Sequence, residues 1–267
     1  MTLDILICSL NKGIVRIEDV LGEPRPDVRY IVSYQYTDER YLELVPESLK
    51  EREDVELHTY MGQGLSRNRN YALERATGDL VIYADDDSRL TNDAPDQIFK
   101  IFEEHPQLNV AFFRACTYTG KLLKQYPEQS RPIKNLPEDY SISTIEMVFR
   151  RDKVQGIIRF DERFGLGTQF LTCGEEDIWL VDALRLGLKM EYFPIHIVET
   201  STMLKRSMIY VDAGVQRSRG AFTYYRYGAK AWLYCFCFAF NCTRRGLTHF
   251  YPMLKHLYQG IRYLQRN

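Results

Sequence analysis

The sequence predicts an α/β fold with a mostly parallel central sheet and helices on both faces. Apolar runs of strand length alternate with helical segments between residues 3 and 198, which is the pattern of such sheets. The chain has 267 residues, enough for one large α/β domain or for a domain with an appendage. Its 45% hydrophobic and 27% charged residues are typical of a globular protein.

The expected elements follow one another in alternation. Most strand-like runs end near Gly, Pro or Asn, and the helical segments have amphipathic spacing. The expected strands are 3–10, 29–36, 55–60, 79–84, 109–116, 144–150 and 190–198. The expected helices are a short one within 38–54 and longer ones at 67–76, 92–104 and 175–188, with a surface loop over 121–140.

The charge distribution predicts where the chain divides. Residues 203–267 carry 11 Lys and Arg residues against one acid, Asp212, although the net charge of the whole chain is only -1. We expect a large α/β domain over 1–202. A basic, aromatic, helical C-terminal segment is expected over 203–267.

The composition of that segment predicts an anionic partner. Residues 222–240 mix aromatic side chains with Arg226 and Lys230. Aromatic residues favour the bilayer interface and basic residues favour anionic headgroups, so an anionic membrane surface is the expected partner of 203–267. A packed helical subdomain or a dimer surface is the open alternative, and no nucleic acid is expected. The apolar stretch 231–240 is shorter than the roughly 20 residues of a membrane span.

The cysteines and the N-terminus predict the compartment. The six cysteines show no C-x-x-C pair, which favours reduced thiols in the cytosol. No secretory signal is expected, because Asp4 interrupts the first apolar run. We expect a cytoplasmic location, with a peripheral position at the inner face of the membrane as an alternative.

Three consecutive carboxylates are the first candidate site. Asp85, Asp86 and Asp87 follow a buried strand, and ligands of open α/β sheets bind at the carboxyl ends of strands. Carboxylates this close repel one another, and a hard divalent cation such as Mn²⁺ or Mg²⁺ would relieve that repulsion. The cation would also bridge a diphosphate. The alternative is a solvated acidic turn that caps the next helix.

Two further motifs carry chemistry. Residues 62–70 read GQGLSRNRN, in which glycines precede a helix start at Ser66 and cationic Arg67 and Arg69, a suitable anion site. Residues 174–180 read GEEDIWL, and an acid there can act as a general base. An ordinary capped helix and a favourable helix dipole are the respective alternatives.

The order of these motifs resembles the large inverting family of GT-A glycosyltransferases, known as glycosyltransferase family 2. Gly64-Leu65-Ser66, Arg69-Asn70 and Gly78-Asp79-Leu80 lead to the three aspartates, and Gly174-Glu175-Glu176-Asp177 follows about ninety residues later. The resemblance covers roughly residues 3–202. It implies a GT-A catalytic domain over 1–202, with a nucleotide half over about 1–115 and an acceptor half over about 116–202. It also implies a nucleotide-sugar donor with UDP favoured, and a glycan or lipid-linked acceptor.

The resemblance also implies roles for individual residues. Asp87 with Asp85 would bind Mn²⁺ or Mg²⁺, and Asp85 or Asp86 would touch the donor ribose. Arg69 lies on the helix beside the nucleotide. Asp177 is the expected catalytic base. The acceptor residues are expected to be Glu176 and Trp179, although a core position is equally open for Trp179.

Other site residues stand where the sequence departs from the family pattern or allows a structural alternative. Leu10 and Asn11 stand at a strand end where the family has a proline, and Gln35 stands where it has a base-reading aspartate. An amide can pair with uracil, so Gln35 is the candidate for base recognition. His196 is a candidate late metal ligand, with a core histidine as the alternative. A nucleotide-sugar-binding module without transfer activity, and less so a nucleotidyltransferase, remain open.

Overall fold

The computed structural model describes residues 1–137, 141–201 and 206–267 and forms two compact units. The sheet unit consists of Met1–Gln63, Arg67–Arg159 and Asp182–Leu204. The helical unit consists of Gly64–Ser66, Phe160–Val181 and Lys205–Asn267. Each unit contains residues from both sides of the predicted boundary at 202, and the division into 1–202 and 203–267 stays a prediction. Each unit is described by itself.

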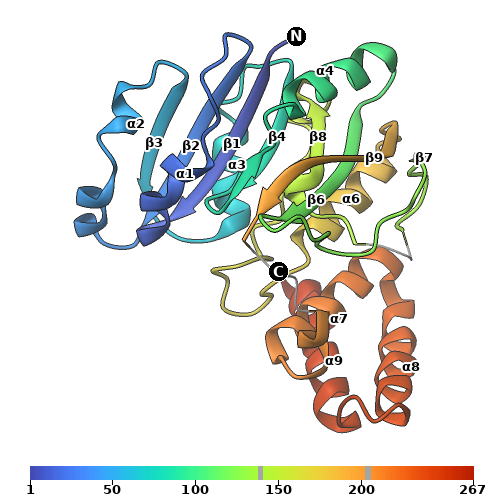
Figure 1. Ribbon diagram of the computed structural model, residues 1–267. Helices are drawn as coiled ribbons and strands as arrows, with labels where there is room; N and C mark the ends of the chain where they lie inside the picture. The colour runs from blue at the N-terminus through green and yellow to red at the C-terminus, as the bar shows by residue number, and fades with distance from the viewer. Residues whose placement is uncertain (138–140, 202–205) are drawn as a thin grey trace. The chain divides into compact units, whose positions relative to one another are not determined.

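Among the described residues, nine strands form one sheet flanked by helices, which confirms the α/β prediction (Figure 1). The strands are β1 (Leu3–Leu10), β2 (Val28–Tyr36), β3 (Val55–Met61), β4 (Leu80–Asp85), β5 (Ser88–Leu90), β6 (Val110–Thr117), β7 (Arg131–Pro132), β8 (Met147–Arg150) and β9 (Met190–Thr200). Their order is β3-β2-β1-β4-β8-β6-β9-β5, and β7 pairs with β9.

The helices fill the connections between the strands. The α-helices before the C-terminal segment are α1 (Ile17–Val20), α2 (Ser48–Glu51), α3 (Leu65–Leu73), α4 (Ala94–Glu104), α5 (Arg151–Val154) and α6 (Glu175–Arg185). Short 3-10 helices occupy Asn11–Arg16, Glu39–Leu44, Thr144–Glu146 and Arg206–Tyr210.

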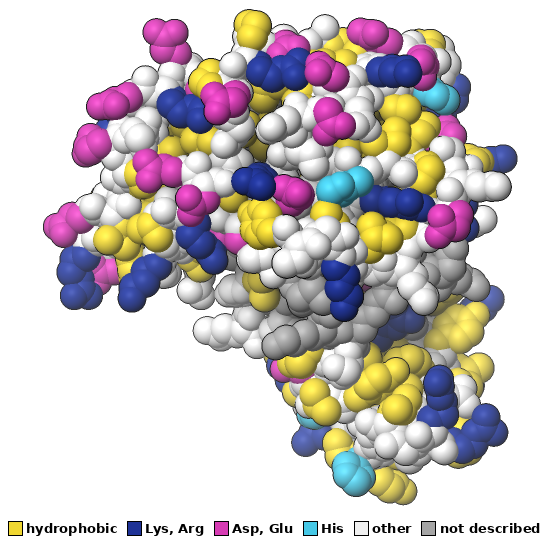
Figure 2. Space-filling view, viewed as in Figure 1, with side chains coloured by type: hydrophobic (Ala, Val, Ile, Leu, Met, Phe, Trp, Pro, Cys, Tyr) yellow, Lys and Arg dark blue, Asp and Glu magenta, His cyan; other side chains and the backbone are white. Residues whose placement is uncertain are grey.

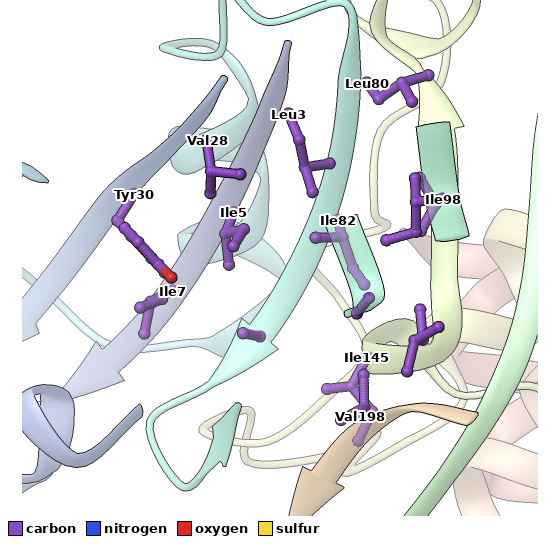
Figure 3. Packing of buried hydrophobic residues seen from close by; sticks show 14 of the residues in the cluster. Leu3, Ile5, Ile7, Val28, Tyr30, Leu80, Ile82, Ile98, Ile145 and Val198 are labelled. Atoms are coloured by element: carbon purple, nitrogen blue, oxygen red, sulfur yellow. The ribbon is translucent and has the colours of Figure 1, made fainter. Parts of the chain in front are cut away.

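The first half of the sheet is parallel and buried on both faces. Strand β1 pairs in parallel with β2 and with β4, and β2 pairs in parallel with β3. All of β1 except Leu10 is buried, as expected for a parallel strand covered on both sides. Figure 3 shows Ile5 and Ile82 of neighbouring strands packed near Ile98 of α4.

The second half of the sheet is mixed. Strand β8 runs antiparallel to β4 and to β6, whereas β6 and β9 are parallel. The fold class is confirmed, but parallel pairing is limited to part of the sheet. The sequence pattern could not indicate this, because a strand buried on both faces has the same composition in either direction.

The strand order places a topological switch point between β1 and β4. The chain moves outward from β1 through β2 to β3 and then returns to the other side of β1 with β4. In open α/β sheets, ligands bind in the crevice outside the carboxyl ends of the strands at such a point. The ends of β1 and β4 carry Leu10 and Asp85, so the fold brings the two predicted donor segments together.

The described part of the C-terminal segment, 206–267, is helical, as predicted. It contains α7 (Ala213–Tyr227), α8 (Ala231–Arg244) and α9 (Phe250–Arg266), with a 3-10 turn at Gly228–Lys230. Helices α7 and α9 approach each other so closely at Gly220 that a Cβ atom there would lie 1.9 Å from the carbonyl oxygen of Leu257. Searched over the described residues, the chain has no helix with the length and apolar character that a membrane span requires.

Candidate functional site

The three aspartates form the turn between β4 and β5, beyond the carboxyl end of β4. The hydroxyl of Ser88 accepts a hydrogen bond from the backbone N–H of Asp85 at 2.8 Å and so closes the turn. Asp85, Asp86 and Asp87 are each half-buried. The local fold therefore presents three carboxylates in one turn at the switch point.

Asp86 contacts the end of β1 and the turn that follows it. Its Oδ2 accepts a hydrogen bond from the Ser9 hydroxyl at 3.0 Å, and its Oδ1 pairs with the Arg16 guanidinium. Burial raises the pKa of the Asp86 carboxyl, while Arg16 and the Ser9 hydrogen bond lower it and Asp87 raises it. Asp86 thus joins the two strand ends of the switch point.

Gly13 makes this contact possible. A Cβ atom at Gly13 would lie 1.8 Å from Asp86 Oδ2 and 2.7 Å from Ser9 Oγ. Both distances are far inside van der Waals contact, so any side chain at this position would displace the Asp86 carboxylate. Gly13, in the 3-10 turn that follows β1, is therefore part of the site rather than only a residue that ends the strand.

Asp85 and Asp87 have different surroundings. Arg69 Nη2 lies 3.8 Å from Asp85 Oδ1, and the Arg69 side chain is buried. Asp87 Oδ2 accepts a hydrogen bond from the Ser201 hydroxyl at 2.6 Å. The backbone carbonyl of Asp87 accepts a second one from the Tyr118 hydroxyl at 3.0 Å. The structure thus brings Arg69, a residue expected beside the nucleotide, to the acidic turn.

The donor atoms of the turn suit a divalent cation that is shared with a ligand. Across residues 1–137, 141–201 and 206–267, no three His, Cys, Asp or Glu side chains gather as a closed metal site would require. Mg²⁺, however, is usually held by one or two carboxylates together with substrate phosphates and water. The carboxylates of Asp85 and Asp87 fit that arrangement, since both supply hard oxygen ligands from one turn.

His196 lies within the sheet. Its Nε2 is 2.8 Å from Cys116 Sγ and 2.8 Å from the carbonyl oxygen of Val198. Both contacts engage the same ring nitrogen, which favours the core alternative for this histidine. Its role as a metal ligand stays a prediction.

Gln35 and Asn11 hold the ends of β1 and β2 in the structure. The Gln35 side chain is buried and its amide donates to the Tyr60 hydroxyl at 2.7 Å. Asn11 has a positive φ of 50° and accepts a hydrogen bond from the backbone N–H of Thr37 at 2.9 Å. Leu10 is exposed beside them. The amide of Gln35 thus faces the interior in this structure, and base recognition by Gln35 stays a prediction.

The structure adds residues that sequence reasoning did not select. Ser9 and Arg16 contact Asp86, and Asn68 of α3 donates from Nδ2 to the carbonyl oxygens of Ser9 and Ser33 at 3.1 Å each. The buried amide of Asn68 thus ties α3 to β1 and β2. The only sequence signal was its position beside Arg69 in a polar helix start.

The second acidic group opens α6 in the helical unit. Glu175 is buried, Glu176 is half-buried and Asp177 is exposed to solvent. The loop at Phe164–Gly165 packs against this helix start: a Cβ atom at Gly165 would lie 3.3 Å from the Glu175 carboxylate. Ser66 does not cap a helix as expected. Helix α3 begins at Leu65, and the Ser66 hydroxyl donates to the carbonyl of Phe164 at 2.6 Å.

Asp177 has a perturbed titration. Its pKa is raised from 3.8 to about 6, first because the surrounding protein displaces water from the charged carboxylate and then because Glu176 repels it. Arg219 and Arg226 of α7 oppose the shift. The side chain nevertheless remains open to solvent at its surface, so a hydroxyl group can reach it. A solvent-accessible carboxylate with a raised pKa is suited to general base chemistry.

Trp179 lies in the core, which was the alternative position for this residue. Its side chain is 2% exposed and stacks on Phe160 with ring centroids 6.4 Å apart. The structure therefore contradicts the expectation that its face is open to an acceptor sugar. The physical reason is helical spacing: Trp179 lies two residues after exposed Asp177, about 200° around α6, which turns it to the buried side.

Comparisons with known proteins agree with this fold. Residues 16–171 match the family model described as Glycosyl transferase family 2. Crystal structures of S. aureus TarS share the fold. TarS 1-349 aligns over 100% of this chain and 92% of that chain, with a TM-score of 0.59 and 11% identity. TarS 1-349 in complex with UDP aligns over 84% of this chain and 66% of that chain, with a TM-score of 0.60 and 14% identity.

TarS 1-349 in complex with UDP-GlcNAc gives a TM-score of 0.56 and 15% identity, over 84% of this chain and 67% of that one. The chain spans 39% of the longer S. aureus TarS crystal structure. No curated protein matches the sequence.

The mixed α/β fold is that of the GT-A glycosyltransferases. Because the family model covers more than half of the sequence, this chain belongs to glycosyltransferase family 2.

Proposed function

We propose that the chain is a metal-dependent, inverting glycosyltransferase. It moves a hexose or N-acetylhexosamine from a UDP-sugar to a glycan or lipid-linked acceptor, in surface polysaccharide synthesis. One observation carries the proposal: three carboxylates at the β1/β4 switch point, bordered by Arg16 and Arg69. Membership of the family supports glycosyl transfer, and the TarS complexes with UDP and UDP-GlcNAc support UDP as the donor nucleotide.

The proposed donor residues lie at the carboxyl ends of β1, β2 and β4 and, for Arg69, on α3. Asp85 and Asp86 are assigned to the ribose side, and Arg69 to the nucleotide beside them. Leu10, Asn11 and Gln35 are assigned to the base and its surroundings. Asp85 and Asp87 would hold Mn²⁺ or Mg²⁺, which when bound neutralises negative charge on the leaving diphosphate.

Asp177 is the proposed general base. Its carboxylate accepts the proton of an acceptor hydroxyl while that oxygen bonds to the anomeric carbon from the face opposite the diphosphate. The bond between the anomeric carbon and the diphosphate oxygen breaks, and its electron pair leaves with the nucleotide. Glu176 is assigned to the acceptor. The raised pKa makes Asp177 a stronger base than an ordinary aspartate, which favours proton transfer.

Calorimetric titration with UDP tests the donor site without an acceptor. We expect UDP to bind in the presence of Mn²⁺ and to bind at least tenfold more weakly with EDTA or in Asp87→Asn. Asp96→Asn is the matched control, because its carboxylate is exposed and pairs with Arg25 rather than with a residue of the acidic turn. Binding of UDP that is equally tight with and without Mn²⁺ would refute the metal assignment.

Release of UDP tests transfer separately, because water can replace an unknown acceptor. A panel of UDP-hexoses and UDP-N-acetylhexosamines is incubated with the wild type and with Asp177→Asn. We expect slow UDP release from one donor and its loss in Asp177→Asn, which still binds UDP in the calorimeter. A wild-type chain that binds UDP but turns over no donor, with or without a glycan acceptor, would favour the binding module instead.

A further inference from the structure

Helix α8 packs on its neighbours in an unusual way. Small side chains face the interior, at Ala231, Cys235, Ala239 and Cys242. Large apolar side chains face solvent instead: Leu233 is 65% exposed, Phe240 is 54% exposed and Phe236 is 43% exposed. A helix of a globular protein normally turns its large apolar residues to the core. The apolar surface of α8 therefore requires a partner outside the described chain.

The exposed residues form one continuous face. Leu233, Phe240 and Arg244 are spaced by seven and four residues, so they lie on one side of α8. Phe236 contacts Phe250 edge-on at 5.5 Å between ring centroids, and Phe250 contacts Tyr251, which is 82% exposed. We name the surface of Leu233, Phe236, Phe240 and Tyr251 the α8 face.

Cations border the α8 face at both ends. Arg226 and Lys230 are exposed before α8, and Arg244 and Arg245 are exposed at its end. Between residues 206 and 267 the sequence contains one acid, Asp212. Figure 2 shows the contrast on one side of the molecule, with hydrophobic and Lys or Arg side chains prominent over the C-terminal helices and Asp or Glu numerous over the sheet.

The charges discriminate between possible partners. Two copies of this chain joined through the α8 face would bring like charges together, which opposes association. A surface rich in anionic headgroups would complement the cations, while the aromatic side chains would enter the interfacial layer. A helix with a large apolar face and basic borders lies in the plane of such an interface.

We propose that the α8 face docks the chain on the surface of an anionic membrane, with α8 parallel to the bilayer. The four cations that border α8 contact the lipid headgroups, and Leu233, Phe236 and Phe240 insert among them. The proposal does not depend on sugar transfer, because the surface contains none of the proposed donor or catalytic residues.

Flotation with liposomes tests the docking on the full chain, without nucleotide or acceptor. Vesicles of zwitterionic lipid alone are compared with vesicles that also contain about a third anionic lipid. We expect the wild type to float with the anionic vesicles and to be released by high salt, which screens exposed charges. Equal recovery with both vesicle types, or no recovery with either, would overturn the proposal.

Two double variants divide the α8 face into its components. Arg244→Gln with Arg245→Gln should weaken binding to anionic vesicles about thirtyfold, the effect of two surface charges. Leu233→Gln with Phe240→Gln should weaken it at least about tenfold through lost apolar burial. All four positions are exposed, so the fold should persist. Unchanged binding by both variants would contradict the assignment.

Matched controls come from the sheet unit. Ile157→Gln with Leu186→Gln removes apolar side chains of similar exposure, 55% and 54%. Lys100→Gln with Lys153→Gln removes two exposed charges. Both controls should bind vesicles like the wild type. Sedimentation of the protein alone tests the competing partner, a second copy of this chain. If the wild type sediments as a dimer, if Leu233→Gln with Phe240→Gln makes it a monomer, and if the wild type does not bind vesicles, the α8 face would be assigned to the second copy and the proposal overturned.

Discussion

The raised pKa of Asp177 predicts an acid limb in the pH dependence of turnover. A general base works only when it is ionised, so activity is lost as the pH falls through its pKa. With a pKa of about 6, the ionised fraction falls from about 90% at pH 7 to about 10% at pH 5. We therefore expect UDP release to fall about tenfold between these pH values. An aspartate with the ordinary value of 3.8 would lose less than about a tenth over the same interval.

The neighbours of Asp177 predict the direction in which variants move this limb. Glu176 raises the pKa of Asp177 by repulsion, so Glu176→Gln should move the midpoint to lower pH. Arg219 lowers that pKa by attraction, so Arg219→Gln should move the midpoint to higher pH. These opposite shifts test the electrostatic cause separately from any loss of acceptor affinity, which would change the rate but not the midpoint.

The assay measures initial UDP release at saturating donor and Mn²⁺, in buffers of constant ionic strength. Calorimetric UDP binding at the same pH values is the control, because it reports whether the metal and the donor still bind. A wild-type midpoint below pH 5 would refute the raised pKa. So would a midpoint that moves to higher pH in Glu176→Gln.

Three further substitutions test the packing. Gly13→Ala places a Cβ atom 1.8 Å from Asp86 Oδ2, so calorimetry should show UDP binding weakened about tenfold or more while thermal unfolding stays within a few degrees of wild type. Lys124→Met removes one partner of a buried ion pair with Glu146, 2.7 Å apart and each 1% exposed, and should lower the free energy of unfolding by about 3–5 kcal/mol in urea titrations. Gly220→Ala forces a Cβ atom against the backbone of α9 and should destabilise the helical unit by about 1–3 kcal/mol, seen as an earlier thermal transition.

The elements that the sequence predicted well are those whose burial is uniform. Strands β1 and β4 are continuous apolar runs because both faces of the sheet are covered, so composition alone marked their extents. Helix α4 was predicted within two residues at its start because Pro95 and the amphipathic spacing mark it. In these cases local propensity and tertiary burial agree.

The direction of β8 could not be predicted in the same way. Its pairing with β4 and β6 depends on which neighbour the chain reaches after β6 and β7, and no local pattern encodes that choice. The same limit applies to Ser66, whose hydroxyl has a tertiary partner, the Phe164 carbonyl, 98 residues away. Tertiary contacts overrode the local capping preference at that position.

The acidic turn and Arg69 were predictable from the sequence, but Arg16 and the uncharged residues that contact the turn were not. The three aspartates directly follow a buried strand and Arg69 follows a glycine-led helix start, and both positions favour ligand binding. Ser9 and Gly13 gave no such signal, since serine and glycine are common at strand ends. Their importance depends on the approach of Asp86, which is 77 residues from Ser9 in the sequence.

The charges of the switch point explain why a cation and a diphosphate should bind together. Asp85, Asp86 and Asp87 carry three negative charges, and Arg16 and Arg69 offset two of them, which leaves a net charge of about -1 at the turn. A diphosphate alone would add negative charge to a turn that is already negative. A divalent cation alone would be attracted to the turn, but two carboxylates are a small ligand set for it. Each ligand therefore raises the affinity of the turn for the other. Because such coupling is reciprocal, Mn²⁺ should tighten UDP binding by the same factor by which UDP tightens Mn²⁺ binding.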